Sequence, residues 1–257
     1  MNALITGASG GLGAEFAKLF AADGYNLILI ARRLEKLNEL KTELENNYGI
    51  SVTVFSSDLS EETAAQKVFD FVQSQNLSID ILVNNAGFGD WAFFSDSNLQ
   101  KQQMMINLNI YTLTTLTHLF LTQMIQRKSG RILNVASIAG FMPGPKMSVY
   151  YASKAFVRSF TEALSVELKK TKSGVTVTAL CPGPISTDFW NKAEADKSQL
   201  SKRVVFANSK KIARYGYKCL MKGKVIALPG ASTRIITFWA KFLPIPLVRN
   251  LVYFFQK

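Results

Sequence analysis

Residues 3–13 of the chain read ALITGASGGLG, a short apolar run that ends in a glycine-rich turn. The segment that follows, residues 14–22, is predicted to be a helix. Glycines let a backbone turn tightly and approach a pyrophosphate group, which then rests on the N-terminus of the following helix. A glycine-rich turn can also occur simply because a tight connection between a strand and a helix has no room for side chains. A glycine-rich turn directly after a strand, as here, favours dinucleotide binding.

Short apolar runs and longer amphipathic segments alternate through the first 180 residues. The runs lack strict apolar–polar alternation, which is typical of strands that are buried on both faces. Repeated strand–helix alternation implies a parallel sheet with helices on both faces. We therefore predict a single Rossmann-like, doubly wound α/β domain of about seven strands, with ligands at the carboxyl ends of the strands. Six of the strands are expected at residues 3–6, 26–31, 52–55, 79–83, 131–135 and 175–180.

Composition narrows the class of protein. With 257 residues, of which 48% are hydrophobic and 19% charged, the chain is expected to fold as one globular domain. We see no signal peptide and no run of about 18 uncharged apolar residues. The two cysteines, Cys181 and Cys219, show neither metal nor redox spacing. We expect a cytoplasmic protein without a metal site.

Two arginines follow the second predicted strand. A site for NAD carries an acidic residue there, about 20 residues after the glycine turn, to bind the ribose 2′-hydroxyl. This chain has Arg32 and Arg33 instead, and guanidinium groups pair well with a phosphate. The alternative is that both arginines simply begin a solvated helix. Their position favours NADP over NAD.

Tyr150 and Lys154 lie four residues apart in the segment YYASK, residues 150–154. On a helix, such residues share one face with Cβ atoms about 5–6 Å apart. Lowering a phenol pKa of about 10 by ~3 units requires about 4 kcal/mol, which one cation at ~4 Å supplies at an effective dielectric of ~20. Lys154 is therefore predicted to make Tyr150 a working acid. By helical geometry alone Tyr151 is nearly as good a partner, and a chance pair on a surface helix is the alternative.

Six motifs together resemble the short-chain dehydrogenase/reductase family through about residue 190. The 13-residue offset between Ser137 and Tyr150 matches the family and selects Tyr150 over Tyr151. One departure is Gly10, since many NADP-preferring relatives place a basic residue there. In chain order the motifs are Thr6-Gly7-x-x-x-Gly11-x-Gly13, Asp58, Asn84-Asn85-Ala86-Gly87, Asn107 within Ile106-Asn107-Leu108, Ser137 with Tyr150 and Lys154, and Pro182-Gly183-x-x-x-Thr187.

The resemblance implies an oxidoreductase that moves a hydride between NADP(H) and a carbonyl or alcohol carbon. Tyr150 would give its proton to the developing alkoxide, and Ser137 would donate a hydrogen bond to the same oxygen. Lys154 would lower the phenol pKa and bind the nicotinamide ribose, and Asn107 would hold a water that returns protons to Lys154. The cofactor residues so implied are Gly7, Ser9, Gly11, Leu12, Gly13, Arg32, Arg33, Asp58, Leu59, Asn85, Ala86, Gly87, Tyr150, Lys154, Pro182, Gly183, Ile185 and Thr187.

Large apolar residues gather in the segments that would surround this site. They predict an apolar pocket with few polar anchors, and hence a hydrophobic ketone or aldehyde such as a steroid-like, aromatic or fatty-acyl carbonyl. The chain looks closest to reductases related to 17β-hydroxysteroid and long-chain 3-oxoacyl reductases. The pocket residues are Phe88, Trp91, Phe93, Phe94, Phe141, Met142, Met147, Phe189 and Trp190.

The whole formal charge of +12 lies in the last 68 residues, which hold 14 Lys/Arg against 2 Asp/Glu. Residues 232–257 are amphipathic with only basic charges, so we treat them as an extension of a catalytic domain at 1–231. The extension fits a lid or subunit interface, a surface anchor on an anionic membrane, or a site for the phosphates of an acyl-CoA. We expect a homo-oligomer, either a dimer or a tetramer.

A different class of function is a non-catalytic NADP(H)-binding sensor or scaffold that kept the fold. Such a protein would need none of Ser137, Tyr150 and Lys154, so their presence favours the enzyme. Nucleic-acid binding is not expected, because the basic region has no recognisable reading motif.

Overall fold

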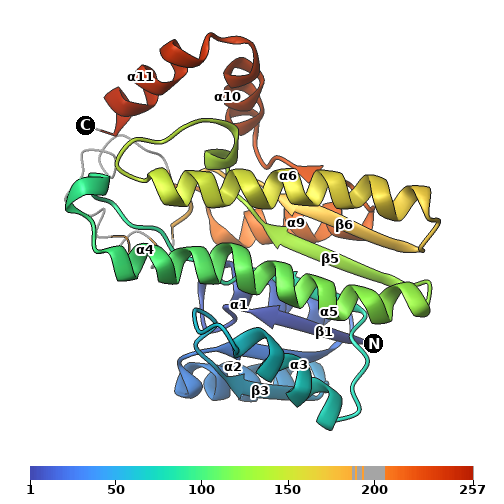
Figure 1. Ribbon diagram of the computed structural model, residues 1–257. Helices are drawn as coiled ribbons and strands as arrows, with labels where there is room; N and C mark the ends of the chain where they lie inside the picture. The colour runs from blue at the N-terminus through green and yellow to red at the C-terminus, as the bar shows by residue number, and fades with distance from the viewer. Residues whose placement is uncertain (187–188, 190–192, 194–205, 257) are drawn as a thin grey trace.

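The computed structural model describes residues 1–186, 189, 193 and 206–256. Its centre is a seven-stranded sheet with the strand order β3-β2-β1-β4-β5-β6-β7 (Figure 1). Every neighbouring pair is parallel. The strands are β1 (Asn2–Thr6), β2 (Asn26–Ala31), β3 (Val52–Ser56), β4 (Ile81–Asn84), β5 (Gly130–Val135), β6 (Val175–Leu180) and β7 (Ile226–Ala227).

The six strands expected from the sequence are all present, with ends shifted by no more than two residues. The central strand β4 is buried along its whole length, and β1, β2, β5 and β6 are buried at nearly every position. This is why their sequences read as continuous apolar runs instead of alternating ones. The seventh strand has only two residues, which is too short for a sequence pattern to reveal.

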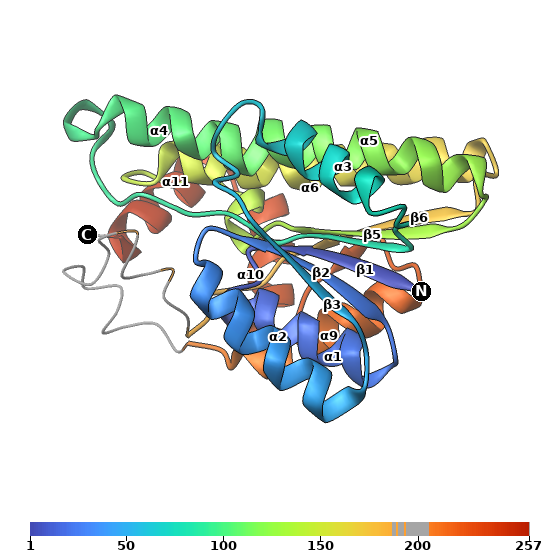
Figure 2. The ribbon, with the colours of Figure 1, turned by 90° about the horizontal axis from the view of Figure 1, so that it is seen from below.

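Helices cover both faces of the sheet, as Figure 2 shows. One face carries α1 (Gly11–Ala22), α2 (Leu34–Tyr48) and α9 (Ser209–Met221), and the other carries α3 (Ala64–Ser74), α5 (Leu113–Gln126) and α6 (Ser148–Lys170). Each face has its own apolar core. Phe16, Phe20 and Leu220 belong to the first core, and Phe120 and Leu164 belong to the second. The prediction of a doubly wound, Rossmann-like α/β domain is confirmed.

Short irregular helices lie near the carboxyl ends of the strands. The 3₁₀ helices are η1 (Phe94–Asp96) and η3 (Ile138–Phe141), and α4 (Leu99–Ile106) runs into a π-helix, η2 (Asn107–Thr112), before α5 begins. π-Helical turns are rare and often occur at functional sites. Here the buried positions Met105, Asn109 and Thr112 continue through the π-helix at intervals of three or four residues.

The C-terminal segment forms a helical hairpin of α10 (Ala231–Phe242) and α11 (Ile245–Phe255). In Figure 1 the hairpin lies over the carboxyl ends of the strands, and α10 packs against η3. Within the described residues, no helix is both long and apolar enough to cross a bilayer. The predicted boundary near residue 232 coincides with the start of α10, while a separate role for the extension stays a prediction.

Candidate active site

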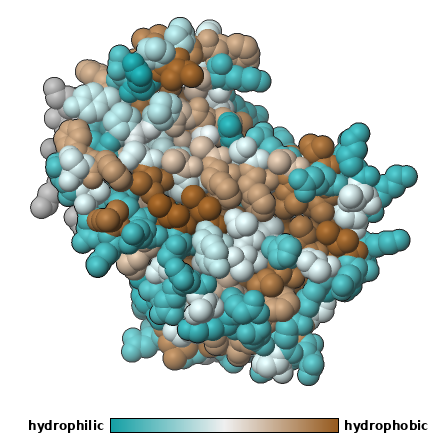
Figure 3. All heavy atoms as spheres, in the orientation of Figure 1, coloured by the Kyte–Doolittle hydropathy of each residue, from teal (hydrophilic) through white to brown (hydrophobic). Residues whose placement is uncertain are grey.

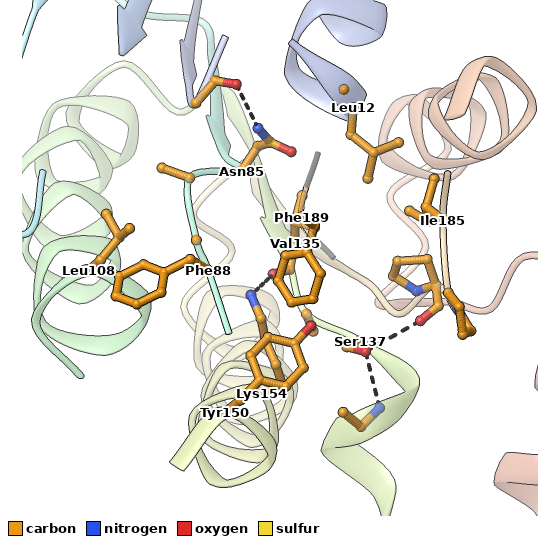
Figure 4. A pocket seen from close by; sticks show the side chains of 18 of the residues that line it. Leu12, Asn85, Phe88, Leu108, Val135, Ser137, Tyr150, Lys154, Ile185 and Phe189 are labelled. Atoms are coloured by element: carbon orange, nitrogen blue, oxygen red, sulfur yellow. Dashed lines mark hydrogen bonds between the residues drawn. The ribbon is translucent and has the colours of Figure 1, made fainter. Parts of the chain in front are cut away.

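A cavity of about 540 Å³ opens at the carboxyl ends of the strands. Segments that follow β1 to β6 line it, and so do the two C-terminal helices. Figure 4 shows Leu12 and Asn85 on one side, with Ser137, Tyr150 and Lys154 gathered on the other. Sixteen of the predicted cofactor residues line this cavity, namely Gly7, Ser9, Gly11, Leu12, Arg32, Arg33, Asp58, Leu59, Asn85, Ala86, Gly87, Tyr150, Lys154, Pro182, Gly183 and Ile185. Thr187 lies outside the described residues.

The glycine turn brings the N-terminus of α1 to the cavity. Gly7 adopts φ +65°, and a Cβ atom there would meet the Asn85 side-chain nitrogen at 2.8 Å. Gly13 is not a lining residue; a Cβ on it would lie 2.3 Å from the Gly7 carbonyl oxygen, so it lets the helix approach the turn. Asn85 donates to the Thr6 carbonyl at 2.9 Å and secures the turn from the β4 side. The helix dipole of α1 favours an anion such as a pyrophosphate at this N-terminus. The first turn of α1 carries no acidic residue that would repel the anion.

The two arginines after β2 differ in position. The Arg33 guanidinium donates to the Ser9 carbonyl at 3.0 Å and to the Ser9 hydroxyl at 3.2 Å. A Cβ on Gly10 would meet the Arg33 Nη2 atom at 3.4 Å. Arg33 therefore supplies a basic group beside the loop position where Gly10 has none. The alternative of two arginines that merely begin a solvated helix does not describe Arg33, which reaches back to the glycine turn.

The Arg32 side chain contacts the Asp58 carboxylate and not the glycine turn. Its Nη1 atom lies 3.4 Å from Asp58 Oδ2. Burial raises the pKa of Asp58, but hydrogen bonds from Ser60 and the charge of Arg32 outweigh it and hold the pKa below its usual value. Asp58 is therefore ionised at neutral pH, and Arg32 is already paired.

Lys154 is buried beside Tyr150 on α6. The side chain of Lys154 is 5% exposed, and its ammonium donates to the Val135 carbonyl at 2.8 Å. It lies 5.7 Å from the centroid of the Tyr150 ring. Burial lowers the pKa of Lys154 to about 8, because the charged form loses hydration. Lys154 is thus mostly charged at neutral pH.

The pKa of Tyr150 differs from the sequence prediction. Desolvation raises the pKa of Tyr150 to about 12, and the Ser137 hydroxyl acts in the opposite direction. The prediction that Lys154 alone lowers this pKa is not met, because the phenol is desolvated and the ammonium is directed to the Val135 carbonyl. Tyr150 therefore holds its proton at neutral pH, which is the form that a proton donor needs.

Ser137 joins the end of β5 to the segment after β6. Its hydroxyl accepts a hydrogen bond from the Ala139 N–H at 3.1 Å and lies 3.5 Å from the Pro182 carbonyl, to which it donates. Figure 4 shows both bonds. They hold the serine at the cavity wall next to Tyr150. The sequence therefore identified Ser137, Tyr150 and Lys154 as a group that the fold does bring together.

The sequence prediction assigned the helix asparagine to Asn107, but the structure favours Asn109. Neither asparagine is among the residues that line the cavity, but Asn107 is half-buried, whereas Asn109, two positions later in the π-helix, is 1% exposed. The Asn109 amide donates to the Phe88 carbonyl at 3.0 Å and to the Ser153 hydroxyl at 3.1 Å, and accepts from the Phe88 N–H at 3.3 Å. A Cβ on Gly87 would meet Asn109 Oδ1 at 2.9 Å and the Lys154 ammonium at 3.4 Å.

Residues two apart on a helix do not share a face, so only one of Asn107 and Asn109 can pack against Phe88, which lines the cavity. The repeated asparagine was a signal that two candidates existed. Asn109 follows the buried Met105 by four residues and precedes the buried Leu113 by four, so it shares their face of the helix.

The apolar pocket is present, with partly different members. Of the nine residues expected from the sequence, Phe88, Met142, Met147 and Phe189 line the cavity. Trp190 lies outside the described residues, and Trp91, Phe93, Phe94 and Phe141 are not among the lining residues. Phe94 is 62% exposed, and Phe141 stacks under the Arg158 guanidinium at 4.5 Å. Additional walls come from Leu108, Ile138, Tyr151, Ile236, Val252 and Gln256.

Comparison with known proteins agrees with this geometry. Residues 1–198 match the family model described as short chain dehydrogenase. The chain belongs to the short-chain dehydrogenase family. This confirms the predicted resemblance, and the match ends before the C-terminal hairpin begins.

Two curated relatives carry the names anticipated from the sequence. The chain is 38% identical over 191 residues to 17-beta-hydroxysteroid dehydrogenase type 3 of Mus musculus, and 36% identical over 191 residues to very-long-chain 3-oxoacyl-CoA reductase of Anas platyrhynchos. Each alignment covers 72% of this chain and 60% of the relative, so the aligned part spans about three fifths of those proteins. A short-chain dehydrogenase from Sphingobium yanoikuyae, solved in complex with NADPH, superposes with a TM-score of 0.84 at 28% identity and covers 94% of this chain and 93% of that one.

Proposed function

We propose that this short-chain dehydrogenase is an NADP(H)-dependent oxidoreductase that reduces an apolar ketone or aldehyde, or oxidises the corresponding secondary alcohol. The observation that carries the proposal is the position of Ser137, Tyr150 and Lys154. They line the same cavity as the glycine turn and as apolar residues such as Phe88 and Met147. The glycine turn suits a dinucleotide, and the apolar residues suit a hydrophobic carbonyl compound.

Each residue of the site has a separate role in the proposed reaction. A nicotinamide cofactor, when bound, supplies or accepts the hydride. Ser137 and Tyr150 present hydroxyl groups to the substrate oxygen, where they stabilise the developing negative charge and deliver a proton. Lys154, charged and held beside Tyr150, favours loss of that proton. We transfer to Asn109 the role that the sequence prediction gave to Asn107, which is to order the polar path that returns protons to Lys154.

Arg33 is proposed to bind the 2′-phosphate of NADP(H). Replacement of Arg33 by alanine should weaken NADPH binding by about 10- to 100-fold, because one charge-assisted contact contributes about 1.5–3 kcal/mol. NADH binding should change little, since NADH lacks this phosphate. Arg32→Ala is the matched comparison and should cost less, because the Arg32 guanidinium points to Asp58 whereas the Arg33 guanidinium lies at the glycine turn. Fluorescence titration with both cofactors measures the effect, and a larger loss in Arg32→Ala would move the phosphate to Arg32.

The apolar wall favours hydrophobic carbonyl substrates, in line with the steroid dehydrogenase and oxoacyl reductase named among the relatives. Steady-state NADPH oxidation should show turnover with aromatic, steroid-like or fatty-acyl carbonyls and little with sugars. A sensor or scaffold would bind NADPH tightly and turn over none of these compounds. That result would reject the enzyme and leave the cofactor site intact.

We propose that the outer face of the α10–α11 hairpin contacts an anionic membrane surface. Nine large apolar side chains of the hairpin that do not line the cavity are each at least 39% exposed, while all formal side-chain charges on the two helices, Arg234, Lys241 and Arg249, are basic. Figure 3 shows hydrophobic side chains beside hydrophilic ones at the top of the molecule, where Figure 1 places this hairpin. Exposed aromatic side chains with basic flanks are typical of helices that lie on anionic lipid. The nine are Ile235, Phe238, Trp239, Phe242, Ile245, Leu247, Leu251, Tyr253 and Phe254.

Co-sedimentation with phosphatidylserine-containing vesicles tests the membrane contact. The protein should pellet with these vesicles, less with pure phosphatidylcholine, and replacing Phe238, Trp239 and Phe242 by glutamine should abolish pelleting. Glutamine at Leu34, Leu99 and Ile125, which are exposed elsewhere, is the matched control and should have no effect. If the first triple variant instead dissociates an oligomer and the intact protein ignores vesicles, the face is a subunit interface. A homo-oligomer and a cytoplasmic location otherwise stay predictions.

A further inference from the structure

Two buried pairs, each of a side-chain hydroxyl and an asparagine amide, join helix α6 to its neighbours. In the first pair, the Asn109 amide donates to the Ser153 hydroxyl at 3.1 Å, and this hydroxyl donates to the Tyr150 carbonyl at 2.7 Å. Ser153 is 0% exposed and does not line the cavity. The proposed reaction uses Tyr150 and Lys154, which flank Ser153 in the sequence, and gives Ser153 itself no role.

The second pair repeats this pattern about two helical turns later on α6. The Asn134 amide donates to the Thr161 hydroxyl at 3.0 Å, and this hydroxyl donates to the Val157 carbonyl at 2.7 Å. Asn134 and Thr161 are each 0% exposed, as Ser153 is. The two pairs therefore make hydrogen bonds of the same kind at the same burial, and they differ in the groups that they connect.

The first pair connects α6 to the wall of the cavity. The Asn109 amide nitrogen also donates to the Phe88 carbonyl at 3.0 Å, and the Asn109 oxygen accepts from the Phe88 N–H at 3.3 Å. Phe88 lines the cavity, and so does Tyr150. Hydrogen bonds thus run from the backbone of Phe88, through Asn109 and Ser153, to the backbone of Tyr150.

The donors and acceptors of this chain of hydrogen bonds match at every step. A serine hydroxyl has one proton, and Ser153 gives it to the Tyr150 carbonyl, so Ser153 can only accept from Asn109. Asn109 gives one amide hydrogen to Ser153 and the other to the Phe88 carbonyl, which leaves its oxygen for the Phe88 N–H. The buried Asn109 amide cannot turn without leaving polar groups unpaired. The network therefore fixes the Phe88 backbone relative to that of Tyr150.

This relative position matters for the chemistry. In the proposed function Tyr150 is the acid and Phe88 is part of the apolar wall, so a shift between them changes how the substrate carbonyl meets the phenol. A misplacement of about 1 Å can reduce a rate by about 10²-fold. The second pair has no such consequence, because none of Asn134, Val157 and Thr161 lines the cavity.

We propose that Ser153 is a positioning residue that holds the Phe88 wall of the cavity in place relative to Tyr150, through Asn109. The inference rests on the proposed function and adds to it a residue that touches neither substrate nor cofactor. Its consequence is that loss of the Ser153 hydroxyl costs more activity than the accompanying loss of stability explains.

Ser153→Ala and Thr161→Val are matched variants, because each removes a buried α6 hydroxyl that accepts from an asparagine. In the full chain, both should shift the urea midpoint by similar amounts. At a temperature where both are folded, Ser153→Ala should lower kcat/KM for an apolar carbonyl compound by about 10- to 100-fold, with most of the loss in kcat. Thr161→Val should keep kcat/KM close to the wild-type value. Equal losses of activity in the two variants would overturn the inference.

Hydrogen exchange supplies a readout that does not require turnover. In the NADP⁺-loaded full chain, Ser153→Ala should speed amide exchange in residues 86–89 by about tenfold, because Asn109 then holds the Phe88 N–H less firmly. Thr161→Val should leave this exchange unchanged. Ser153→Cys keeps a weaker donor and acceptor, so it should lie between wild type and alanine, and it serves if the alanine variant does not fold.

The two readouts separate this inference from the proposed function. Unchanged exchange at residues 86–89 in the folded Ser153 variants would overturn the positioning role, even in an active enzyme. Faster exchange in Ser153→Ala, together with a wild-type protein that turns over no carbonyl compound, would reject the proposed function and leave the positioning contact standing.

Discussion

Replacement of Tyr150 by phenylalanine is expected to reduce turnover of any apolar carbonyl substrate by about 10³-fold or more, because positioned general acids contribute about 10²–10⁴-fold. The variant removes only the hydroxyl that holds a proton at neutral pH. It keeps the ring, whose centroid lies 5.3 Å from that of Phe189. Steady-state NADPH oxidation measures the loss.

The control separates chemistry from folding and cofactor binding. Tyr150→Phe should bind NADPH with an unchanged dissociation constant, because the ring and the Lys154–Val135 hydrogen bond remain. Tyr48→Phe removes a hydroxyl from a tyrosine that is 42% exposed on α2, and it should retain full turnover. If Tyr150→Phe turns over substrate at the wild-type rate, Tyr150 is not the acid.

Replacement of Asn109 by alanine is expected to be the more damaging of the two asparagine substitutions. It removes three hydrogen bonds, two of them to the Phe88 backbone. Each polar group left buried and unpaired costs about 1–3 kcal/mol, so we expect a loss of about 2–3 kcal/mol in the free energy of unfolding. Turnover should fall as well, since Asn109 holds the backbone of Phe88, which lines the cavity.

Asn107→Ala is the matched control at the position chosen from the sequence. Asn107 is only half-buried, so its replacement should change the free energy of unfolding by about 0.5 kcal/mol or less. Urea unfolding and the pH dependence of kcat are the two measurements. A shifted pH profile in Asn109→Ala would report on proton return, which lost packing alone would not change. The reverse order of effects would restore Asn107 as the functional residue.

The local sequence was sufficient to predict features that depend only on contacts between residues close together in the chain. The glycines at 7 and 13 are required by backbone contacts within one strand–turn–helix unit, and the spacing of Tyr150 and Lys154 is set by one helix. Strands that are buried on both faces can be recognised in the sequence because they form continuous apolar runs. The sheet order then follows from few alternatives, because parallel crossovers are right-handed and short.

The direction in which a side chain points was harder to predict than the place of its residue in the fold. Arg32 and Arg33 are adjacent, yet one turns to Asp58 and the other to Ser9. Asn107 and Asn109 are separated by one residue, yet only Asn109 reaches Phe88. In both pairs, contacts with segments from 21 to 26 residues away decide the direction of the side chain.

The pKa of Tyr150 was missed for a related reason. A two-charge estimate includes the attraction of a neighbouring ammonium but omits the desolvation of the phenol, which depends on every group that surrounds it. Desolvation is the larger effect at Tyr150. The same desolvation lowers the pKa of Lys154 to about 8.

By itself, the sequence determined the doubly wound fold, the family, the glycine turn and the trio of Ser137, Tyr150 and Lys154, because periodicity and short spacings encode these features. Only the tertiary structure showed that Arg33 reaches the glycine turn, that Asn109 reaches Phe88 and Ser153, and that the C-terminal hairpin lines the cavity. Gln256 meets Tyr151 across 105 residues of sequence. No local pattern specifies such a contact, because it depends on how the packed sheet and helices place two distant segments side by side.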